Sequence, residues 1–366
     1  MKNQITKPTL IVDEKNCKQK IAAMLEKAKR NNVDFRPHFK THQSIEIGRW
    51  FRELGTQKIT VSSISMATYF ASDSWDDITV AFPVNWLEID TINEISKKIK
   101  LNLLVESIET IQFLESHLKS GVGIFIKIDT GYHRTGVSSK NISMIGQLIQ
   151  EVNKSESLKF LGFLTHSGHT YKTNSIQEIK EIHDHSLQEL KKLKVAFHSD
   201  EHPVFISIGD TPSISLMEEF EGVDEIRLGN FIFYDLVQEQ LGACTFKDIS
   251  VVLACPIVAK HPERNKVVIY GGGVHLSKEF ITDKNGRKIF GRMLKLNDYG
   301  WTEPLDNCYL SSVSQEHGIL NAPRDILNAL KIGEVIGILP VHSCMTADLQ
   351  HSYLNLNGNK IPNHRN

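Results

Sequence analysis

Lys40 has the sequence surroundings of a reactive amine. It lies in residues 36–42 (RPHFKTH), directly after an apolar approach that we interpret as a short strand. Neighbouring cationic groups and partial burial both lower the pKa of a lysine, and the neutral amine is the form that makes a Schiff base. A solvent-exposed lysine in a basic turn accounts for these residues equally well. The rest of the chain has to decide between the two interpretations.

Two glycine-containing loops further along could hold a phosphate group. Gly209 permits close backbone approach, Thr211 offers a hydroxyl, and a helix begins directly behind them; Gly229 and Asn230 form a second flexible turn. Backbone N–H groups at the start of a helix bind phosphate without a cationic side chain, although an ordinary helix cap and an ordinary turn explain each loop by itself. A reactive lysine together with a phosphate site indicates pyridoxal 5'-phosphate, held covalently at one end and electrostatically at the other.

Two other polar loops offer groups that could contact such a cofactor. Arg134 could donate to the ring oxygen of the cofactor, or it could form a salt bridge with Asp129. His166, His169 and Tyr171 follow the next predicted strand, and each could donate to the cofactor or act as an acid or base. Their spacing does not rank them.

His342 and Cys344 form a short metal-type motif directly after a predicted strand. Residues two apart on an extended chain point the same way, so the imidazole and the thiol could share one metal ion. These ligands suit zinc, with manganese as the alternative, and two ligands leave positions for water and substrate. A buried cysteine beside a turn histidine is the structural alternative. His317, in the polar cluster 315–317 (QEH), could be a third ligand, a group that supports a ligand, or a catalytic base.

The elements that would position these groups alternate regularly up to about residue 240. Short β-branched or aromatic runs predict strands at 33–39, 59–62, 78–82, 101–105, 122–128, 160–165, 204–208 and 226–233. The intervening stretches predict helices at 15–31, 43–54, 66–72, 86–97, 108–118, 141–152, 175–194 and 213–220. In the helix 175–194, which is rich in lysine and glutamate, we expect His183 and His185 to be exposed.

Eight strands in alternation with helices predict a (β/α)8 barrel, with a doubly wound open sheet as the rival. The barrel is favoured because the polar clusters follow the C-terminal ends of the strands, where barrel enzymes carry their working residues. We assign residues 15–241 to this cofactor-binding barrel.

After about residue 241 the alternation stops. Strands predicted at 249–259, 266–270, 280–282, 288–293, 309–313 and 335–339 have no comparable helices between them, and Asn285-Gly286 predicts a hairpin. Residues 242–366 therefore form a mostly antiparallel β domain that carries the metal motif. Within residues 1–14, the segment 9–12 is expected to return to that domain as an extra strand.

Length and composition predict a two-domain globular protein. The chain has 366 residues, 40% of them hydrophobic, and a formal net charge of -1, which gives no basic excess for binding nucleic acid. We find no run of 18 apolar residues and no signal-peptide core, so we expect no membrane span. Five dispersed cysteines, an odd number, argue for a reducing, cytoplasmic setting.

Taken together, these motifs resemble the D-serine dehydratase and D-threonine aldolase family. The resemblance rests on RPHFKTH at 36–42, GYHRTG at 131–136, GDTP at 209–212, RLGN at 227–230 and HSC at 342–344. It implies fold-type III pyridoxal phosphate enzymes with an alanine-racemase-like barrel, a C-terminal β domain and a homodimeric assembly. One departure is Asp210, which stands where the family usually has a small or hydroxyl residue and places a carboxylate beside the phosphate.

The resemblance also implies roles for individual residues. Lys40 would carry the Schiff base, and His342 and Cys344 would hold a divalent metal. The remaining contacts to the cofactor would come from Gly209, Thr211, Gly229 and Asn230 at the phosphate, and from Arg134 and Tyr171 at the ring.

Our hypothesis is a lyase acting on small D-3-hydroxy amino acids. In a D-serine dehydratase, Lys40 removes the α-proton and the metal assists the departing hydroxide, which gives a 2-oxo acid and ammonia. In a D-threonine aldolase, His169 or His317 takes the hydroxyl proton, and glycine and an aldehyde form. The His-x-Cys motif resembles the dehydratase branch, whereas we associate His-x-Asp with the aldolase branch. An amino-acid racemase and a non-catalytic pyridoxal phosphate carrier are the further alternatives.

Overall fold

Two compact units make up the chain in a computed structural model that describes residues 5–200 and 203–365. The first, which we call the barrel unit, consists of Ala22–Lys40 and Phe51–Gly229. The second, the β unit, consists of the chain up to Ile21, Thr41–Trp50 and the chain from Asn230 onward. The boundary therefore crosses the backbone directly after Lys40 and directly after Gly229.

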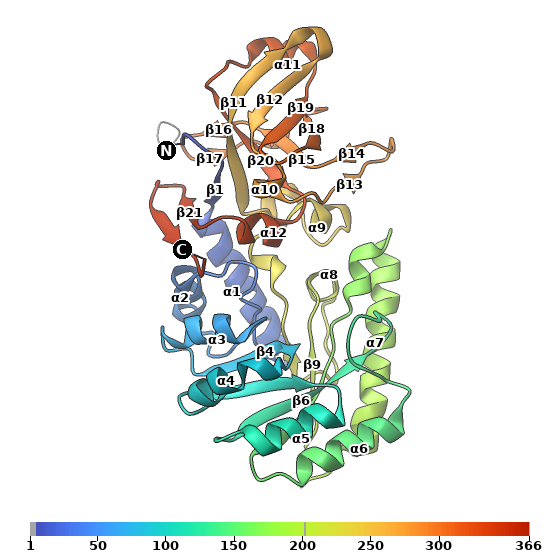
Figure 1. Ribbon diagram of the computed structural model, residues 1–366. Coiled ribbons are helices and arrows are strands. Elements are labelled where there is room, and N and C mark those ends of the chain that lie inside the picture. The colour runs from blue at the N-terminus through green and yellow to red at the C-terminus, as the bar shows by residue number, and fades with distance from the viewer. Residues whose placement is uncertain (1–4, 201–202, 366) are drawn as a thin grey trace. The chain divides into compact units, whose positions relative to one another are not determined.

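The barrel unit contains, among its described residues, eight parallel strands in one closed ladder (Figure 1). Their order is β2-β3-β4-β5-β6-β8-β9-β10, and β10 pairs with β2 through Glu225↔Asp34. The ladder closes where His38 bridges Thr60. The strands are β2 (Asp34–Phe35), β3 (Ile59–Val61), β4 (Asp77–Pro83), β5 (Lys100–Val105), β6 (Val122–Asp129), β8 (Leu158–Leu164), β9 (Phe205–Ile208) and β10 (Glu225–Ile226), with β7 (Val137–Ser138) beside β6. This arrangement confirms the predicted (β/α)8 barrel.

The first and last barrel strands are shorter than predicted. Pro37 has no N–H to donate, so the ladder is interrupted between β2 and the bridge at His38. The predicted strand 226–233 ends at Ile226, and its distal part becomes the 3-10 turn η4 (Asn230–Ile232). Beyond the two strands, the segment after β2 stays bonded to the segment after β10, because the His38 N–H donates to the carbonyl of Leu228 (3.0 Å).

Side-chain caps begin most of the barrel-unit helices directly after the strand-end loops. Ser63, Ser107, Asn141, Ser175 and Asp210 each accept the N–H of the residue three positions later. The capped helices are α3 (Ile64–Ala71), α5 (Ile108–His117), α6 (Ile142–Asn153), α7 (Ile176–Phe197) and α8 (Thr211–Leu216). The 3-10 turn η2 (Trp86–Glu88) leads into α4 (Ile89–Ser96), while α1 (Glu14–Arg30) and α2 (Ile45–Glu53) each cross a unit boundary.

The helix α7 is long but charged, and it corrects one prediction. His183 is buried, with its ring 6.3 Å from that of Phe220, because this face of α7 packs inward. The prediction of exposure is therefore wrong for His183, while His185 is exposed. In residues 5–200 and 203–365, no helix has both the length and the apolar character needed to cross a membrane.

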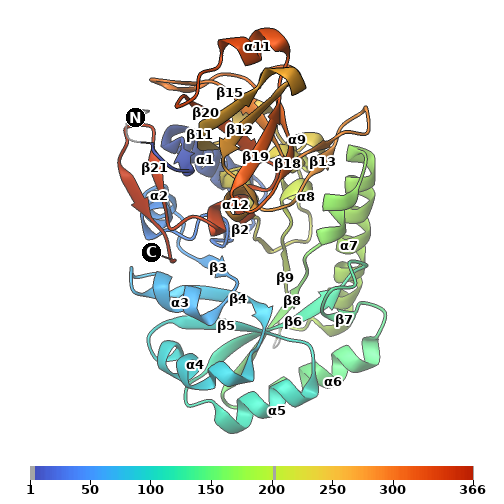
Figure 2. The same ribbon diagram turned by 45° about the horizontal axis from the view of Figure 1, so that its top comes forward.

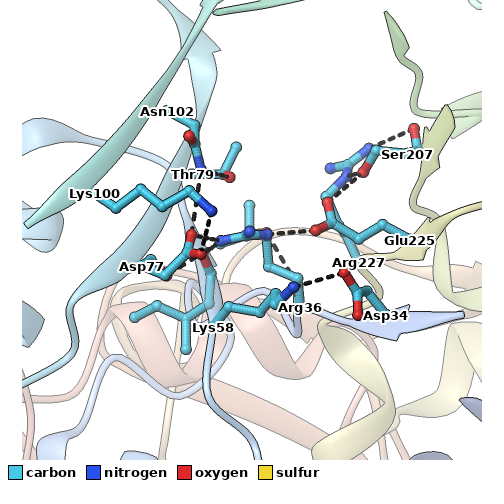
Figure 3. Close-up of polar contacts among 12 residues, drawn as sticks. Asp34, Arg36, Lys58, Asp77, Thr79, Lys100, Asn102, Ser207, Glu225 and Arg227 are labelled. Atoms are coloured by element: carbon cyan, nitrogen blue, oxygen red, sulfur yellow. Dashed lines mark hydrogen bonds and ion pairs between the residues drawn. The ribbon is translucent and has the colours of Figure 1, made fainter. Parts of the chain in front are cut away.

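A buried ion network lies at the starting ends of the barrel strands (Figure 3). The Arg36 guanidinium donates from Nε to Glu225 (2.6 Å) and from Nη1 to Asp77 (2.6 Å), with only 4% of its side chain exposed. Burial alone would lower the pKa of Arg36, but the two carboxylates raise it. Ser207 donates to Glu225 (2.7 Å) and accepts from Arg227 (2.6 Å). The network thus joins β4, β9 and β10 to the segment that leads to Lys40.

The β unit is organised around a second closed sheet (Figure 2). Six mostly antiparallel strands follow one another in the order β11-β12-β19-β18-β15-β20, and β20 returns to β11. They are β11 (Val251–His261), β12 (Lys266–Tyr270), β15 (Gly291–Leu294), β18 (Tyr309–Val313), β19 (His317–Asn321) and β20 (Val335–Pro340). A register shift in β11 between Ile257 and Ala259 lets this long strand pair with several neighbours.

The sheet of the β unit also recruits the start of the chain. The strand β1 (Thr9–Val12) pairs antiparallel with β11 and parallel with β21 (Ser352–Asn355), which in turn pairs with β22 (Lys360–Pro362). The smaller ladders are the hairpin β13 (Ile281–Thr282) with β14 (Lys288–Ile289), and β16 (Leu296–Asn297) with β17 (Gly300–Trp301). Short helices α9 (Leu236–Gln240), α10 (Gly273–Leu276), α11 (Arg324–Ala329) and α12 (Ser343–Asp348) fill the connections.

We predict that Arg36→Met strongly destabilises the barrel unit. The substitution leaves the buried Glu225 without its ion-pair cation, while Asp77 keeps its ion pair with Lys100 (2.9 Å). An uncompensated buried charge typically costs about 3–5 kcal/mol. Urea unfolding followed by tryptophan fluorescence measures the loss. The matched control is Lys58→Met, which removes the more exposed pair with Asp34 (2.6 Å) and should cost less than about 1 kcal/mol. Equal effects of the two substitutions would contradict the role of Arg36.

Candidate functional site

Packing of its neighbour Phe39 fixes the backbone at Lys40. The Phe39 ring is fully buried and lies 4.9 Å from Phe51, 4.9 Å from Phe70 and 5.2 Å from Trp75. The N–H of Phe39 donates to Thr60 (2.8 Å). The next residue, Lys40, is exposed at the end of this anchored segment. The backbone that leads into Lys40 is therefore held in place, and the side chain of Lys40 is exposed.

The pKa of His166 is sensitive to several positively charged side chains of the barrel unit. Its Nδ1 contacts the carbonyl of Gly209. Burial, followed by the positive charges of Lys40 and Lys127, holds the pKa of His166 well below its usual value. The imidazole is therefore neutral. His166 contacts Gly209 and also feels the charge of Lys40, so the loop at Gly209 and Lys40 act on the same side chain.

Lys127 is a buried cationic group that sequence reasoning missed. It lies on β6 with 6% of its surface exposed. Burial and the positive charges of Arg227 and Arg134 lower its pKa to about 7. The signal in the sequence is a single lysine inside the apolar run 124–128 (IFIKI), where a strand buried on both faces would carry none.

Hydrogen bonds tie the predicted phosphate loop to the loop after β8. The N–H of Thr211 donates to the Tyr171 hydroxyl (3.1 Å). Asp210 accepts from the Thr170 hydroxyl (3.1 Å) and from the N–H of Ser213 (2.9 Å), so its carboxyl group caps α8. Burial raises the pKa of Asp210. The residue that departs from the family pattern thus has a structural task of its own in this loop.

Arg134 and His169 both lie close to the aromatic ring of Tyr132. The Arg134 guanidinium is 4.9 Å from the centre of that ring, and the His169 ring is stacked at 6.1 Å. Asp129 binds His133 (2.8 Å), so the salt bridge weighed between Asp129 and Arg134 is replaced by this pair. Burial lowers the pKa of His169, and its buried Nδ1 has no hydrogen-bond partner in the described residues.

In the β unit, His342 and Cys344 are in contact at the start of α12. The local geometry differs from the extended strand that we expected, because His342 is the N-cap and Cys344 already lies in the helix. Burial would lower the pKa of His342, but hydrogen bonds with Cys344 and Glu279 raise it to about 11. Burial would raise the pKa of Cys344, but His342 lowers it. The contact therefore favours a proton on His342 over a proton on Cys344.

Two further side chains contact the sulfur of Cys344. The Thr41 hydroxyl lies 3.2 Å from Cys344 Sγ, and the Asn230 amide lies 3.3 Å from it. The same Asn230 amide contacts Asp235 (2.7 Å), which also accepts the N–H of Ser343 (2.9 Å). The side chain of Asn230, predicted to contact a phosphate, is thus directed toward Cys344.

His317 lies at the start of β19 and is not grouped with His342 and Cys344. It begins β19, is exposed, and pairs with Tyr270 across the ladder. Its neighbour Glu316 lies 3.6 Å from His275. Within residues 5–200 and 203–365, no three histidine, cysteine or acidic side chains are arranged to hold a metal ion. The structure therefore gives His317 no place as a third ligand.

Comparisons with known proteins cover both units. Residues 12–236 match the alanine racemase N-terminal domain, and residues 250–356 match the putative serine dehydratase domain. The D-serine dehydratase of Dictyostelium discoideum is 31% identical over 401 residues, covering 99% of this chain and 96% of that protein. The chain belongs to the D-serine dehydratase family. The family, its alanine-racemase-like fold and its class of pyridoxal-phosphate-dependent lyases, all expected from the sequence, are confirmed.

Solved structures show how far the fold of this family extends. D-threo-3-hydroxyaspartate dehydratase from Delftia sp. HT23 superposes with a TM-score of 0.90 at 22% identity, covering 98% of this chain and 97% of that chain. The same enzyme matches as a metal-free cysteine-to-alanine variant and as a histidine-to-alanine variant, with TM-scores of 0.89 and 0.88. D-threonine aldolase from Filomicrobium marinum gives 0.85 at 18% identity, covering 99% of this chain and 95% of that chain.

We predict that Lys127 makes the free energy of unfolding increase as the pH rises above about 7. Its pKa is about 7 in the folded protein and about 10.4 when unfolded, so the unfolded state binds more protons between these values and stability rises with pH there. Lys127→Met should remove up to about 1.4 kcal/mol of this rise for each pH unit. Urea unfolding from about pH 7 to about pH 9 measures it. The exposed Lys97→Met is the control, and parallel pH profiles for wild type and Lys127→Met would contradict the prediction.

Proposed function

We propose that this chain is a D-serine dehydratase-type lyase that uses pyridoxal 5'-phosphate and a divalent metal ion. Its substrates are small D-3-hydroxy amino acids. The observation that carries the proposal is the contact between His342 and Cys344, because the His-x-Cys pair is the motif that we associate with the dehydratase branch. The 31% identity to a D-serine dehydratase over nearly the whole chain supports it.

The barrel unit suits an anionic cofactor. Lys40, Lys127 and Arg134 all lower the pKa of His166, so positive charge is concentrated there. Gly209 leaves backbone accessible where a Cβ would lie 3.1 Å from the Cβ of Arg227. Among these groups, the residues proposed to hold the cofactor are Lys40, Arg134, Tyr171, Gly209 and Thr211. The family resemblance adds Gly229 and the backbone of Asn230.

Each group has a defined task in the proposed reaction. Pyridoxal phosphate, when bound, supplies an electron sink for the negative charge that develops at the substrate α-carbon. Lys40 Nζ removes the proton from that carbon. Arg134 donates toward the cofactor ring, and its contact with Tyr132 holds the guanidinium in place. The β-hydroxyl then leaves as water by taking up a proton. The released enamine tautomerises to an imine, which one water molecule hydrolyses to a 2-oxo acid and ammonia.

The donor set at the start of α12 suits a divalent metal. A thiolate and an imidazole are typical zinc ligands, with manganese as the alternative, and metal binding displaces the proton that they share. In the Delftia enzyme, the substituted histidine and cysteine of the two variants are two positions apart, the same spacing as His342 and Cys344. The metal, when bound, supplies a Lewis acid for the departing hydroxyl group.

A D-threonine aldolase is the second candidate, and His169 favours it. Its lowered pKa keeps the imidazole neutral near pH 7, so it can accept a proton from a substrate hydroxyl. A racemase needs a second base at the α-carbon and no metal. A pyridoxal phosphate carrier needs no β unit, whereas residues 250–356 here match the serine dehydratase domain. We expect a homodimer from the family resemblance.

We predict that D-serine is converted to pyruvate and ammonia, and that the activity requires the metal. Treatment with a chelator should lower kcat by about a hundredfold or more, because the leaving hydroxide loses its Lewis acid, and added zinc should restore it. His342→Ala and Cys344→Ala should behave like the chelated wild type. Acetaldehyde from D-threonine without pyruvate from D-serine would identify the aldolase instead, and unchanged activity after chelation would refute the metal site.

We predict that Lys40→Ala abolishes covalent attachment of the cofactor. After incubation with pyridoxal phosphate, borohydride reduction and denaturation, the wild type should retain the reduced cofactor on Lys40, and the variant should retain none. Activity should fall by about a thousandfold or more, because the variant also lacks the proposed base. Lys97→Ala changes an exposed lysine and should behave like wild type. Retention of the reduced cofactor by Lys40→Ala would refute the assignment.

A further inference from the structure

Glu279 is an acidic partner of His342 that no motif or spacing in the sequence indicates. Its Oε2 lies 2.6 Å from His342 Nδ1, although 63 residues separate the two. A hydrogen bond of this length between a carboxylate and an imidazole is charge-assisted and directional. Because 49% of the Glu279 side chain is exposed, the carboxylate also reaches solvent.

The loop that carries Glu279 is fastened to the helix that follows His342. The Thr346 hydroxyl, on α12, donates to the carbonyl of Leu276 at the end of α10 (3.1 Å). Ser277 then turns the chain with a φ of 77°, in a region that few residues other than glycine adopt. The Ser277 hydroxyl accepts the N–H of Glu279 (3.2 Å). The position of the carboxylate is therefore fixed by its own loop.

The contact decides which nitrogen of His342 can bind a metal. A ring nitrogen that donates its proton to a carboxylate cannot also be a ligand, so the other nitrogen carries the lone pair. With Nδ1 directed at Glu279, Nε2 is the nitrogen available for a metal that Cys344 also binds. The carboxylate also makes the imidazole a better electron donor.

Charge compensation points to the same residue. A divalent cation held by the Cys344 thiolate and a neutral His342 leaves one positive charge uncompensated. The Asp235 carboxylate accepts from Asn230 and Ser343 and keeps its negative charge while it does so. Thr41 and Asn230 contact the sulfur without adding charge. Glu279 is the carboxylate in direct contact with the imidazole, so it adds negative charge on that side of the site.

We propose that Glu279 is a positioning residue for metal binding, which sets the orientation and tautomer of His342 and adds negative charge beside its imidazole. This inference rests on the proposed metal site at His342 and Cys344. Loss of a carboxylate that supports a metal-bound histidine typically weakens metal binding by about 10- to 100-fold. The same reduction is expected for Glu279→Gln.

The experiment measures the zinc dissociation constant of the cofactor-loaded enzyme by competition with a chromophoric chelator. Glu279→Gln should raise this constant by about 10- to 100-fold, and Glu279→Asp should recover part of the loss because it restores the charge on a shorter side chain. The matched control is Glu263→Gln, which alters a glutamate 3.7 Å from His261 on an exposed turn and should leave the constant unchanged. Equal urea midpoints would show that folding is unaffected.

Three results would overturn the inference, and they separate it from the proposed function. A zinc constant within about twofold of wild type for Glu279→Gln, with zinc lost in His342→Ala, refutes the role of Glu279 alone. A loss as large as that of His342→Ala would make Glu279 a direct ligand rather than a positioning residue. Wild-type enzyme that binds no zinc would refute the metal site and the inference together.

Discussion

The guanidinium of Arg36 can stay buried only while Glu225 and Asp77 remain beside it, and the barrel unit depends on this condition. The two carboxylates belong to the starts of β10, which pairs with β2, and of β4, which pairs with β3, so the ion network links the segment that contains Arg36 to both strands. Four residues later the same segment reaches Lys40. The ion network holds Arg36 and aromatic packing holds Phe39, so both ends of the segment 36–39 are fixed. The backbone position of Lys40 follows from these two anchors.

The two units have opposite electrostatic characters. In the barrel unit, Lys40 and Lys127 gather around a neutral His166, which is an environment for an anion. In the β unit, Cys344 and Glu279 both contact His342, which is an environment for a cation. Lys40 is exposed and Glu279 is half-exposed, so solvent screens part of the charge at each site. The two proposed ligands have opposite signs, because the phosphate of the cofactor is an anion and the metal ion is a cation.

The sequence was informative where chemistry and chain order coincide. Parallel strands place their ends on one rim, so the loops that hold Lys40, Arg134, His169 and Gly209 could be recognised without coordinates. The contact of His342 with Cys344 was also predictable from spacing, although it forms at a helix start rather than on a strand. Glu279 and Thr41 could not be found in this way, because they reach the pair from 63 and 303 residues away. The high charge content of α7 led to the wrong prediction for His183, because its burial depends on which face of the helix packs inward.

The pairing of β1 with β11 and β21 has a consequence for the order in which the protein can assemble during synthesis. Thr9–Val12 must wait for partners that emerge from the ribosome more than two hundred residues later. Residues 51–229 are continuous, so most of the barrel strands can pair as they appear. Thr41–Trp50, directly after Lys40, belongs with the late-forming unit. A nascent chain can therefore hold a largely formed barrel while Lys40, the proposed cofactor lysine, is still followed by a segment whose own unit is incomplete.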